Sequence, residues 1–173
     1  MLYLLRQGQT DWNLFHRANG VTETFLNQTG IDYAEKAAKL LSHIHFNAVF
    51  SSPQKRTLQT CEIVWRGAIT TDDRLREIIC GEFEGMEETR EMMQDFYRVI
   101  QTGDKGTEKM DDFMQKQFDF CDMVNNQYAG KNLLVVTHAA NIRAIDFYMK
   151  GKPSGYNFSV TPIKSGEFYA YEI

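Results

Sequence analysis

Residues 2–13 read LYLLRQGQTDWN, a run of apolar side chains that passes directly into charged and amide side chains. Similar short apolar runs, partly β-branched or aromatic, occur at 48–50 (AVF) and at 133–136 (LLVV). Short apolar runs that lead into polar or turn residues are typical of buried β-strands. The three runs therefore predict three strands of one sheet. The polar residues that follow them are Arg6-Gln7, Ser51-Ser52 and Thr137-His138.

Helical patterns lie between these strands. They cover 31–44 and 53–65, and a third covers 139–149 after the last apolar run. In the second pattern, Ser52 is placed to cap the helix N-terminus and Pro53 to be its first residue. Strands that alternate with helices form a mostly parallel sheet with helices on both faces. The sequence therefore predicts an α/β fold, a three-layer sandwich.

Two further segments complete the predicted domain, which spans 1–173 as a single unit. Residues 159–173 alternate apolar and polar side chains around 164–166 (KSG), which predicts a C-terminal hairpin that closes one side of the sheet. The segment 82–122 is rich in methionine and phenylalanine, and its spacing predicts two amphipathic helices with a break near 102–104. It forms a small helical insertion in the domain.

The apolar residues of the insertion 82–122 have two interpretations. In the first, which we favour, the two helices bury their own apolar stripe as a helical subdomain. In the second, the flexible methionine and aromatic side chains form a lid over a substrate. The sequence pattern is the same in both cases, so both interpretations stay open at this point.

Composition argues against several classes of partner. The formal net charge is -4, whereas a protein that binds nucleic acid or an anionic membrane needs a basic excess, so we expect neither partner. The three cysteines are odd in number and lack CxxC spacing, which predicts neither a disulfide framework nor a thiolate metal site. The apolar start is too short for a signal-peptide core, and no stretch is long enough to span a membrane. We expect a cytoplasmic protein.

The polar residues that follow the strands predict a pocket for an anion. In parallel sheets, ligands bind beyond the carboxyl ends of the strands, where Arg6, Arg56 and His138 are expected to emerge. Guanidinium groups bind phosphate or carboxylate through bidentate, charge-assisted hydrogen bonds. The predicted helix after His138 would add the N–H group of Ala139 at its N-terminus. The expected ligand is a small phosphorylated metabolite, inorganic phosphate or another oxyanion.

The same segments resemble the motifs of a known family. LYLLRQGQTDWN resembles the opening motif of the histidine phosphatase superfamily, also called the phosphoglycerate mutase-like family. Four later segments resemble further motifs of that family, in the family's order. These segments are SSPQKRTLQT (51–60), RLREIICGEFEG (74–85), VVTHAANIRAI (135–145) and YNFSV (156–160). The resemblance extends over almost the whole chain and is strong for the fold, but it does not define the substrate.

The resemblance implies roles for particular residues. Arg6, Arg56 and His138 would bind the phosphoryl group, and Asn13 would help to line the pocket. Glu77 would be the proton donor to the leaving oxygen, since the family spacing places the acid four residues before a glycine, here Gly81. No metal ion and no cofactor is expected, because the arginines supply the positive charge.

Glu77 also has a purely structural interpretation. It lies close in sequence to Arg74 and Arg76, so its carboxylate could form an ion pair with either of them. We weigh this only a little below the catalytic interpretation.

The chain departs from the family at Gln7. The family has a histidine there, which attacks phosphorus and carries the phosphoryl group as a covalent intermediate. The lone pair of a carboxamide nitrogen is delocalised into the carbonyl, so Gln7 is a poor nucleophile, and it does not titrate near neutral pH. Its amide can still donate a hydrogen bond to a phosphate oxygen. We therefore expect phosphate binding without turnover.

The leading hypothesis is a phosphomonoester hydrolase of the histidine phosphatase type that is catalytically disabled by Gln7. One alternative is a naturally inactive pseudo-phosphatase that serves as a phosphate-ligand binding or regulatory module. A phosphoglycerate mutase is less favoured, because 82–122 contains twelve acidic and five basic residues and would repel a bisphosphate. A third hypothesis is a protein-interaction module that uses an exposed apolar patch in that segment.

Overall fold

A computed structural model describes residues 1–154 and 163–173 of the chain. The described residues form a five-stranded sheet in the order β3-β2-β4-β1-β5. Strands β1 to β4 are parallel, and β5 pairs antiparallel with β1 at one edge. The strands are β1 (Leu2–Arg6), β2 (Ala48–Ser51), β3 (Thr70–Thr71), β4 (Leu133–Thr137) and β5 (Phe168–Tyr171).

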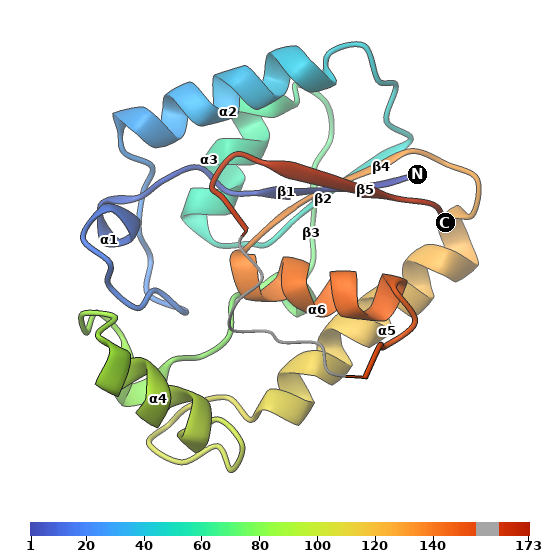
Figure 1. The fold of residues 1–173 in the computed structure, drawn as a ribbon. Coiled ribbons are helices and arrows are strands. Elements are labelled where there is room, and N and C mark those ends of the chain that lie inside the picture. Colours follow the sequence, from blue (N-terminus) through green and yellow to red (C-terminus); the bar gives the residue numbers. More distant parts are fainter. Residues whose placement is uncertain (155–162) are drawn as a thin grey trace.

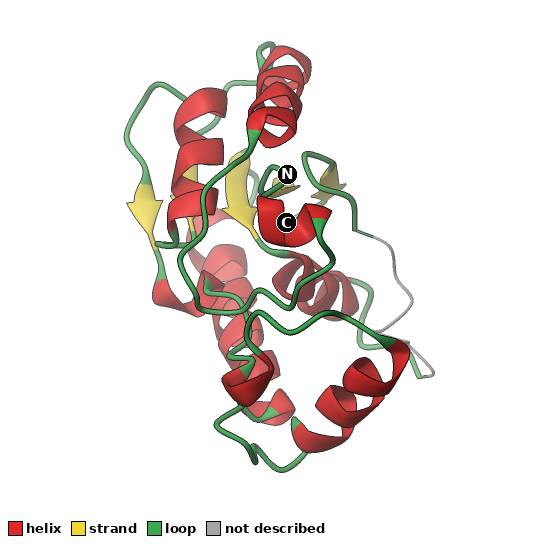
Figure 2. Ribbon diagram, turned by 90° about the vertical axis from the view of Figure 1, so that its left-hand side faces the viewer, coloured by secondary structure: helices red, strands yellow, loops and turns green. Residues whose placement is uncertain are grey.

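Helices cover both faces of the sheet (Figure 1). Helices α2 and α3 lie on one face, and α5 and α6 lie on the other; Figure 2 shows the strands in a row between helices. The predicted three-layer α/β fold is confirmed. The helices are α1 (Asp11–Leu14), α2 (Gln28–Leu41), α3 (Lys55–Val64), α4 (Arg90–Val99), α5 (Met110–Tyr128) and α6 (Ala139–Met149), with short 3-10 helices η1 (Asp73–Leu75) and η2 (Gly81–Phe83).

The capping prediction for α3 was wrong. The helix begins at Lys55, with Gln54 rather than Ser52 at the N-cap position, and Pro53 precedes it. The hydroxyl of Ser52 lies 2.9 Å from the Nε2 atom of His138. The same hydroxyl accepts a longer hydrogen bond from the N–H of Gln54, at 3.4 Å, so Ser52 contacts both His138 and the residue at the N-cap position.

The start of α2 also differs from the prediction, by three residues. The helix begins at Gln28 because the side chain of Asn27 accepts a hydrogen bond from the Gly30 N–H, at 2.9 Å. An asparagine in this position satisfies one of the N–H groups that a helix N-terminus leaves unpaired. The spacing of the apolar residues, from which the helix was predicted to begin at 31, gave no indication of this first turn.

The C-terminal part of the chain closes one side of the sheet. A turn joins the N–H of Glu167 to the carbonyl of Lys164, at 3.2 Å, and β5 then pairs with β1. The other arm of the predicted hairpin, from 159, begins outside the described residues. The family-like segment 156–160 also lies outside them.

The apolar residues of the predicted insertion belong to two packing clusters. Phe96 of α4 and Phe113 at the start of α5 are 8% and 1% exposed and pack in one cluster with Phe83 of η2. Phe120 and Cys121, later in α5, are 0% and 1% exposed and pack against the strands. Met86 of the same segment is 47% exposed. Most of the apolar stripe is therefore buried within the molecule.

The described part of the chain contains no helix that is both long and apolar enough to cross a membrane. Its three cysteines, Cys61, Cys80 and Cys121, are free thiols in buried positions. Burial raises the pKa of the Cys61 and Cys121 thiols to about 12, so both stay protonated near neutral pH.

The loop after β1 and the first turn of α2 approach each other closely. A Cβ atom on Gly30 would lie 2.1 Å from the carbonyl oxygen of Gln9, and one on Gly8 would lie 2.3 Å from the carbonyl oxygen of Gly30. Distances this short to backbone atoms cannot be relieved by a side-chain rotation. The two glycines therefore let the loop after β1 pass against α2.

Gly30→Ala is expected to lower the free energy of unfolding by about 1–3 kcal/mol, because the added methyl group forces the two backbones apart. Alanine favours helix formation, so an unconstrained position would gain stability instead. The neighbouring exposed residue provides the control: Thr29→Ala should change stability by less than about 0.5 kcal/mol. Urea unfolding of both variants measures this. A Gly30→Ala variant as stable as the parent would contradict the close contact.

Candidate active site

A cavity of about 870 Å³ lies at the carboxyl ends of β1 and β4. In Figure 1, β1 runs away from the labelled N-terminus, and α1 and α4 lie beyond its end. Five of the residues singled out in the sequence line this cavity: Arg6, Gln7, Asn13, Glu77 and Ala139. Residues distant in sequence therefore meet at the edge of the sheet where ligands of parallel α/β proteins bind.

Arg56 lies behind the cavity wall and is 1% exposed. Its guanidinium donates hydrogen bonds to the backbone carbonyls of Gly20 at 2.7 Å, Thr22 at 3.1 Å and Asn19 at 3.4 Å. Burial lowers the pKa of Arg56, and the nearby carboxyl of Glu77 partly offsets this effect. Arg56 thus supports the loop 19–22 and adds positive charge behind the wall.

His138 is completely buried at the N-cap position of α6. Burial lowers its pKa well below the usual value, and the positive charges of Arg56 and Arg6 lower it further. The imidazole is therefore neutral near neutral pH. Its Nε2 atom contacts the Ser52 hydroxyl at 2.9 Å. Neutral His138 can act as a hydrogen-bonding group, but it does not add a permanent positive charge.

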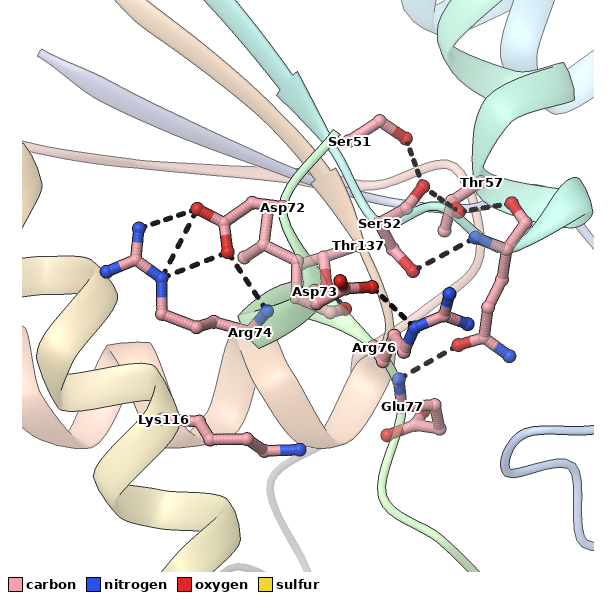
Figure 3. Close-up of polar contacts among 12 residues, drawn as sticks. Ser51, Ser52, Thr57, Asp72, Asp73, Arg74, Arg76, Glu77, Lys116 and Thr137 are labelled. Carbon is pink, nitrogen blue, oxygen red and sulfur yellow. Dashed lines mark hydrogen bonds and ion pairs between the residues drawn. The ribbon is translucent and has the colours of Figure 1, made fainter. Parts of the chain in front are cut away.

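Glu77 lies on the cavity wall, after η1 (Figure 3). Its N–H donates to the side-chain oxygen of Gln54 at 2.9 Å, and its own carboxylate accepts from the Ile78 N–H at 3.0 Å. Burial raises the pKa of Glu77, while Arg56 and Arg6 act in the opposite direction. Desolvation therefore favours the protonated carboxyl, the form that can donate a proton.

The ion pairs of the neighbouring arginines do not involve Glu77. Arg74 pairs with Asp72 at 2.6 Å, and Arg76 pairs with Asp73 at 2.8 Å, as Figure 3 shows. The structural interpretation of Glu77, an ion pair with one of these arginines, therefore does not describe this site.

Gln7 follows β1 and is 3% exposed. Its backbone N–H donates to the Thr137 carbonyl at 3.0 Å, which extends the pairing of β1 with β4 by one residue. The side-chain oxygen is buried, and no described residue forms a hydrogen bond with it. The amide group of Gln7 thus lies on the cavity wall, within reach of a ligand.

Three further buried polar atoms lie near Gln7. They are the Nε atoms of Arg6 and Arg56 and the Nδ1 atom of His138, and none has a hydrogen-bond partner among the described residues. A buried donor without a partner costs about 1–3 kcal/mol, so such a group favours any ligand that supplies an acceptor. The charges of Arg6 and Arg56 act on the pKa of both Glu77 and His138, lowering both.

Asn13 lines the cavity from α1 but uses its side chain locally. Its side-chain oxygen accepts hydrogen bonds from the N–H and the hydroxyl of Thr10, both at 3.0 Å, and its own N–H donates to the Thr10 hydroxyl. This reciprocal pairing is a capping box. Asn13 therefore stabilises the first turn of the short helix at the cavity rim.

Sequence reasoning missed Gln54 as part of this site. Its side chain is fully buried and joins two segments, since it donates to the Gly20 carbonyl at 2.9 Å and accepts from the Glu77 N–H. It therefore couples the loop 19–22 to Glu77. A glutamine in a polar helical segment gives no sequence signal for such a position.

Sequence reasoning also missed Arg143 and Tyr97, which line the cavity from α6 and α4. Both lie in amphipathic helical patterns, where arginine and tyrosine are ordinary residues. The described residues include no group of three or more metal-ligating side chains that could hold a metal ion.

Known proteins of one family resemble this chain in sequence and in fold. Residues 2–162 match the profile of the histidine phosphatase superfamily (branch 1). The chain is 30% identical over 148 residues to the uncharacterized phosphatase PhoE of Bacillus subtilis, which covers 82% of this chain and 73% of that protein.

Two other relatives extend the comparison. The 2,3-bisphosphoglycerate-dependent phosphoglycerate mutase 2 of Gloeobacter violaceus is 27% identical, over 84% of this chain and 73% of its own. The crystal structure of the alpha-ribazole phosphatase from Shigella flexneri superposes with a TM-score of 0.82 at 23% identity, over 96% of this chain and 87% of that one, which shows the shared fold. The chain belongs to the histidine phosphatase superfamily.

Proposed function

We propose that this chain binds a small phosphomonoester in the cavity at the end of β1, and that Gln7 prevents its hydrolysis. The observation that supports this most directly is the cluster of buried, unpaired nitrogen atoms on Arg6, Arg56 and His138 beside Glu77. Even an ionised Glu77 carboxylate would neutralise only one of the two desolvated guanidinium groups, and burial raises the pKa of Glu77, so an excess of positive charge is left. A phosphoryl dianion would compensate this charge and accept a hydrogen bond from Arg6, which lines the cavity, while Arg56 acts through its charge.

In the proposed binding mode, each polar group of the site makes a different contribution to binding the phosphomonoester. Arg6 and the N–H of Ala139 at the start of α6 contact the phosphoryl oxygens, and Arg56 supplies charge from behind the wall. Gln7 donates a hydrogen bond through its amide. Glu77, when protonated, is placed to give its proton to the ester oxygen.

The missing step is nucleophilic attack. With histidine at position 7, an imidazole nitrogen would form a bond to phosphorus while the ester P–O bond breaks and the leaving oxygen takes the Glu77 proton. Water would then break the P–N bond and return a proton to the Glu77 carboxylate. Gln7 cannot start this sequence, because its amide nitrogen has no available lone pair. The chain is thus a phosphatase fold that has lost its nucleophile.

A phosphate-binding or regulatory module is the second candidate. It is favoured by the combination of Gln7 with an otherwise complete set of anion-binding groups, since binding needs Arg6 and His138 but no nucleophile. A mutase is less favoured, because the acidic excess of 82–122 opposes a second anionic group. We expect the activity of the Gln7→His variant to separate the first two candidates.

The first prediction concerns Gln7 itself. Gln7→His should increase phosphate release from a panel of phosphomonoesters by at least about 10³-fold, because covalent catalysis becomes possible. The matched control is Gln7→Asn, which keeps a carboxamide and should stay as inactive as the parent. Equal rates in all three proteins, with phosphate binding intact, would support the binding module instead.

The second prediction concerns Glu77 in the Gln7→His background. Glu77→Gln should slow hydrolysis most for alkyl phosphates, whose poor leaving groups need the proton, and little for 4-nitrophenyl phosphate. A protonated acid is required, so turnover of alkyl phosphates should be high below the raised pKa of Glu77 and fall as the pH rises through it. This decline should disappear in Glu77→Gln. Equal slowing of both ester classes would contradict the role of proton donor.

The third prediction concerns anion binding by the chain with Gln7. Phosphate or vanadate should raise the melting temperature, because a ligand that binds only the folded state stabilises it. Arg6→Ala should abolish the increase. The control is Arg98→Ala, which removes the same charge from an exposed position on α4. If neither anion changes the melting temperature of the parent chain, the proposed phosphate site is wrong.

A further inference from the structure

The cavity is much larger than a phosphate group requires. Its volume of about 870 Å³ lies in the range of pockets that enclose a drug-sized ligand. The anion-binding groups occupy the end of the cavity at Arg6, Gln7 and Ala139. The remaining space must therefore accommodate whatever is esterified to the phosphate, and its lining indicates the chemistry of that part.

The opposite wall is apolar and is built by α4 and the start of α5. It consists of seven residues without charge: Met92, Met93, Phe96, Tyr97, Ile100, Met110 and Phe113. The hydroxyl of Tyr97 is the single side-chain oxygen or nitrogen among these seven. The charged residues of the cavity come from other segments of the chain, so this wall offers no cation to a second anionic group.

For four of these seven residues, packing in the core is enough to explain why the side chain is apolar. Met92, Phe96, Ile100 and Phe113 are at most 8% exposed and belong to the cluster of α4 and α5. The other three, Met93, Tyr97 and Met110, are partly exposed and pack against that cluster from the cavity side. The second group covers the core with apolar surface that a ligand can contact.

We infer that the ester part of the ligand is an uncharged apolar group, aromatic or branched aliphatic, which packs against Met93, Tyr97 and Met110. This inference rests on the proposed function and names the substrate class of the same site. Methionine side chains adapt to irregular apolar shapes and make favourable contacts with aromatic rings. A sugar or a second phosphate in the same place would lose its hydration without gaining hydrogen-bond partners.

Cations on other parts of the cavity lining define the competing possibility: Arg17, Lys36, Arg143 and Lys164. Arg143 is the one among them whose charge acts on the pKa of both Glu77 and Tyr97. A carboxylate near Arg143 would make a doubly anionic ligand such as 3-phosphoglycerate the preferred one. The acid Glu88 also lines the cavity and influences Tyr97, which weakens the attraction of this region for an anion.

The test compares ligand affinities by isothermal titration calorimetry on the chain with Gln7. The ligands are inorganic phosphate, glycerol 1-phosphate, 1-naphthyl phosphate and 3-phosphoglycerate. Glycerol 1-phosphate and 1-naphthyl phosphate carry the same charge, so they differ only in the ester group. We expect 1-naphthyl phosphate to bind at least about 10-fold more tightly than glycerol 1-phosphate, because it buries apolar surface on the wall.

Two variants connect this preference to the wall. Met93→Gln and Met110→Gln keep the length of the side chain but make it polar, and both positions are partly exposed, so folding is expected to persist. Each substitution should weaken the binding of 1-naphthyl phosphate by about 3–10-fold and leave the affinity for inorganic phosphate unchanged. Met86→Gln is the matched control, because Met86 is an exposed methionine outside this cavity, and it should change neither affinity.

The outcomes separate this inference from the proposed function. If inorganic phosphate binds but 1-naphthyl phosphate binds no more tightly than glycerol 1-phosphate, the apolar substrate class is wrong and the phosphate site stands. Tighter binding of 3-phosphoglycerate than of 1-naphthyl phosphate would also overturn the inference and indicate a second anion-binding group in the cavity. If none of the four ligands binds, the proposed function is wrong and the inference falls with it.

Discussion

The parallel pairing of β1 with β4 is the constraint on which the candidate site depends. Its register places Arg6 opposite Thr137, and the Gln7 N–H continues the pairing to the Thr137 carbonyl. The residues after the two strands, Gln7 and His138, therefore leave the sheet side by side. The five residues of β4 are completely buried, so a shift in register would expose apolar side chains and is strongly disfavoured. Packing of the sheet thus fixes the position of the polar groups.

Burial then determines the charge of each polar group. It favours the neutral imidazole of His138 and the protonated carboxyl of Glu77, whereas Arg6 and Arg56 remain the sources of positive charge. The loop 19–22 maintains this arrangement, since Arg56 and Gln54 donate to its carbonyls and the carboxylate of Glu84 accepts from its N–H groups. In the function proposed here, a site assembled in this way is prepared for an anion before the anion arrives. Preorganisation of this kind is what electrostatic catalysis and tight anion binding both require.

Gln7 is the one position at which the described residues of the site differ from what phosphoryl transfer needs. Membership of the histidine phosphatase superfamily is shown by the sequence and the fold, whereas the loss of turnover follows from the carboxamide chemistry of Gln7 and is our proposal. The same environment explains why binding and turnover can be separated. Anion binding uses charge and hydrogen-bond donors that several residues share, but nucleophilic attack depends on a single atom.

The sequence by itself determined the fold class and the residues that surround the end of β1. Short apolar runs identified β1, β2 and β4, alternation identified the segment that contains β5, and helical periodicity identified most helices, because burial leaves a local signature. The two-residue strand β3 has no such signature and was not predicted. The pattern did not locate the first turn of α2 or the true start of α3. The start of α2 depends on the hydrogen bond that the Asn27 side chain accepts from the Gly30 N–H, and Ser52, the predicted cap of α3, contacts His138, which is far away in the chain.

Only the tertiary structure decided which residues line the cavity and which support it from behind. It placed Arg56 behind the cavity wall, joined Gln54 to Glu77, and brought Met93 and Tyr97 of α4 to the same cavity as Arg6. It also paired Arg74 and Arg76 with other carboxylates than Glu77. The contacts of Arg56 with the loop 19–22 and of Gln54 with Glu77 have no local sequence signature, because they join segments whose distance along the chain carries no information about their distance in space. The pairs Arg74–Asp72 and Arg76–Asp73, in contrast, join near neighbours in the sequence.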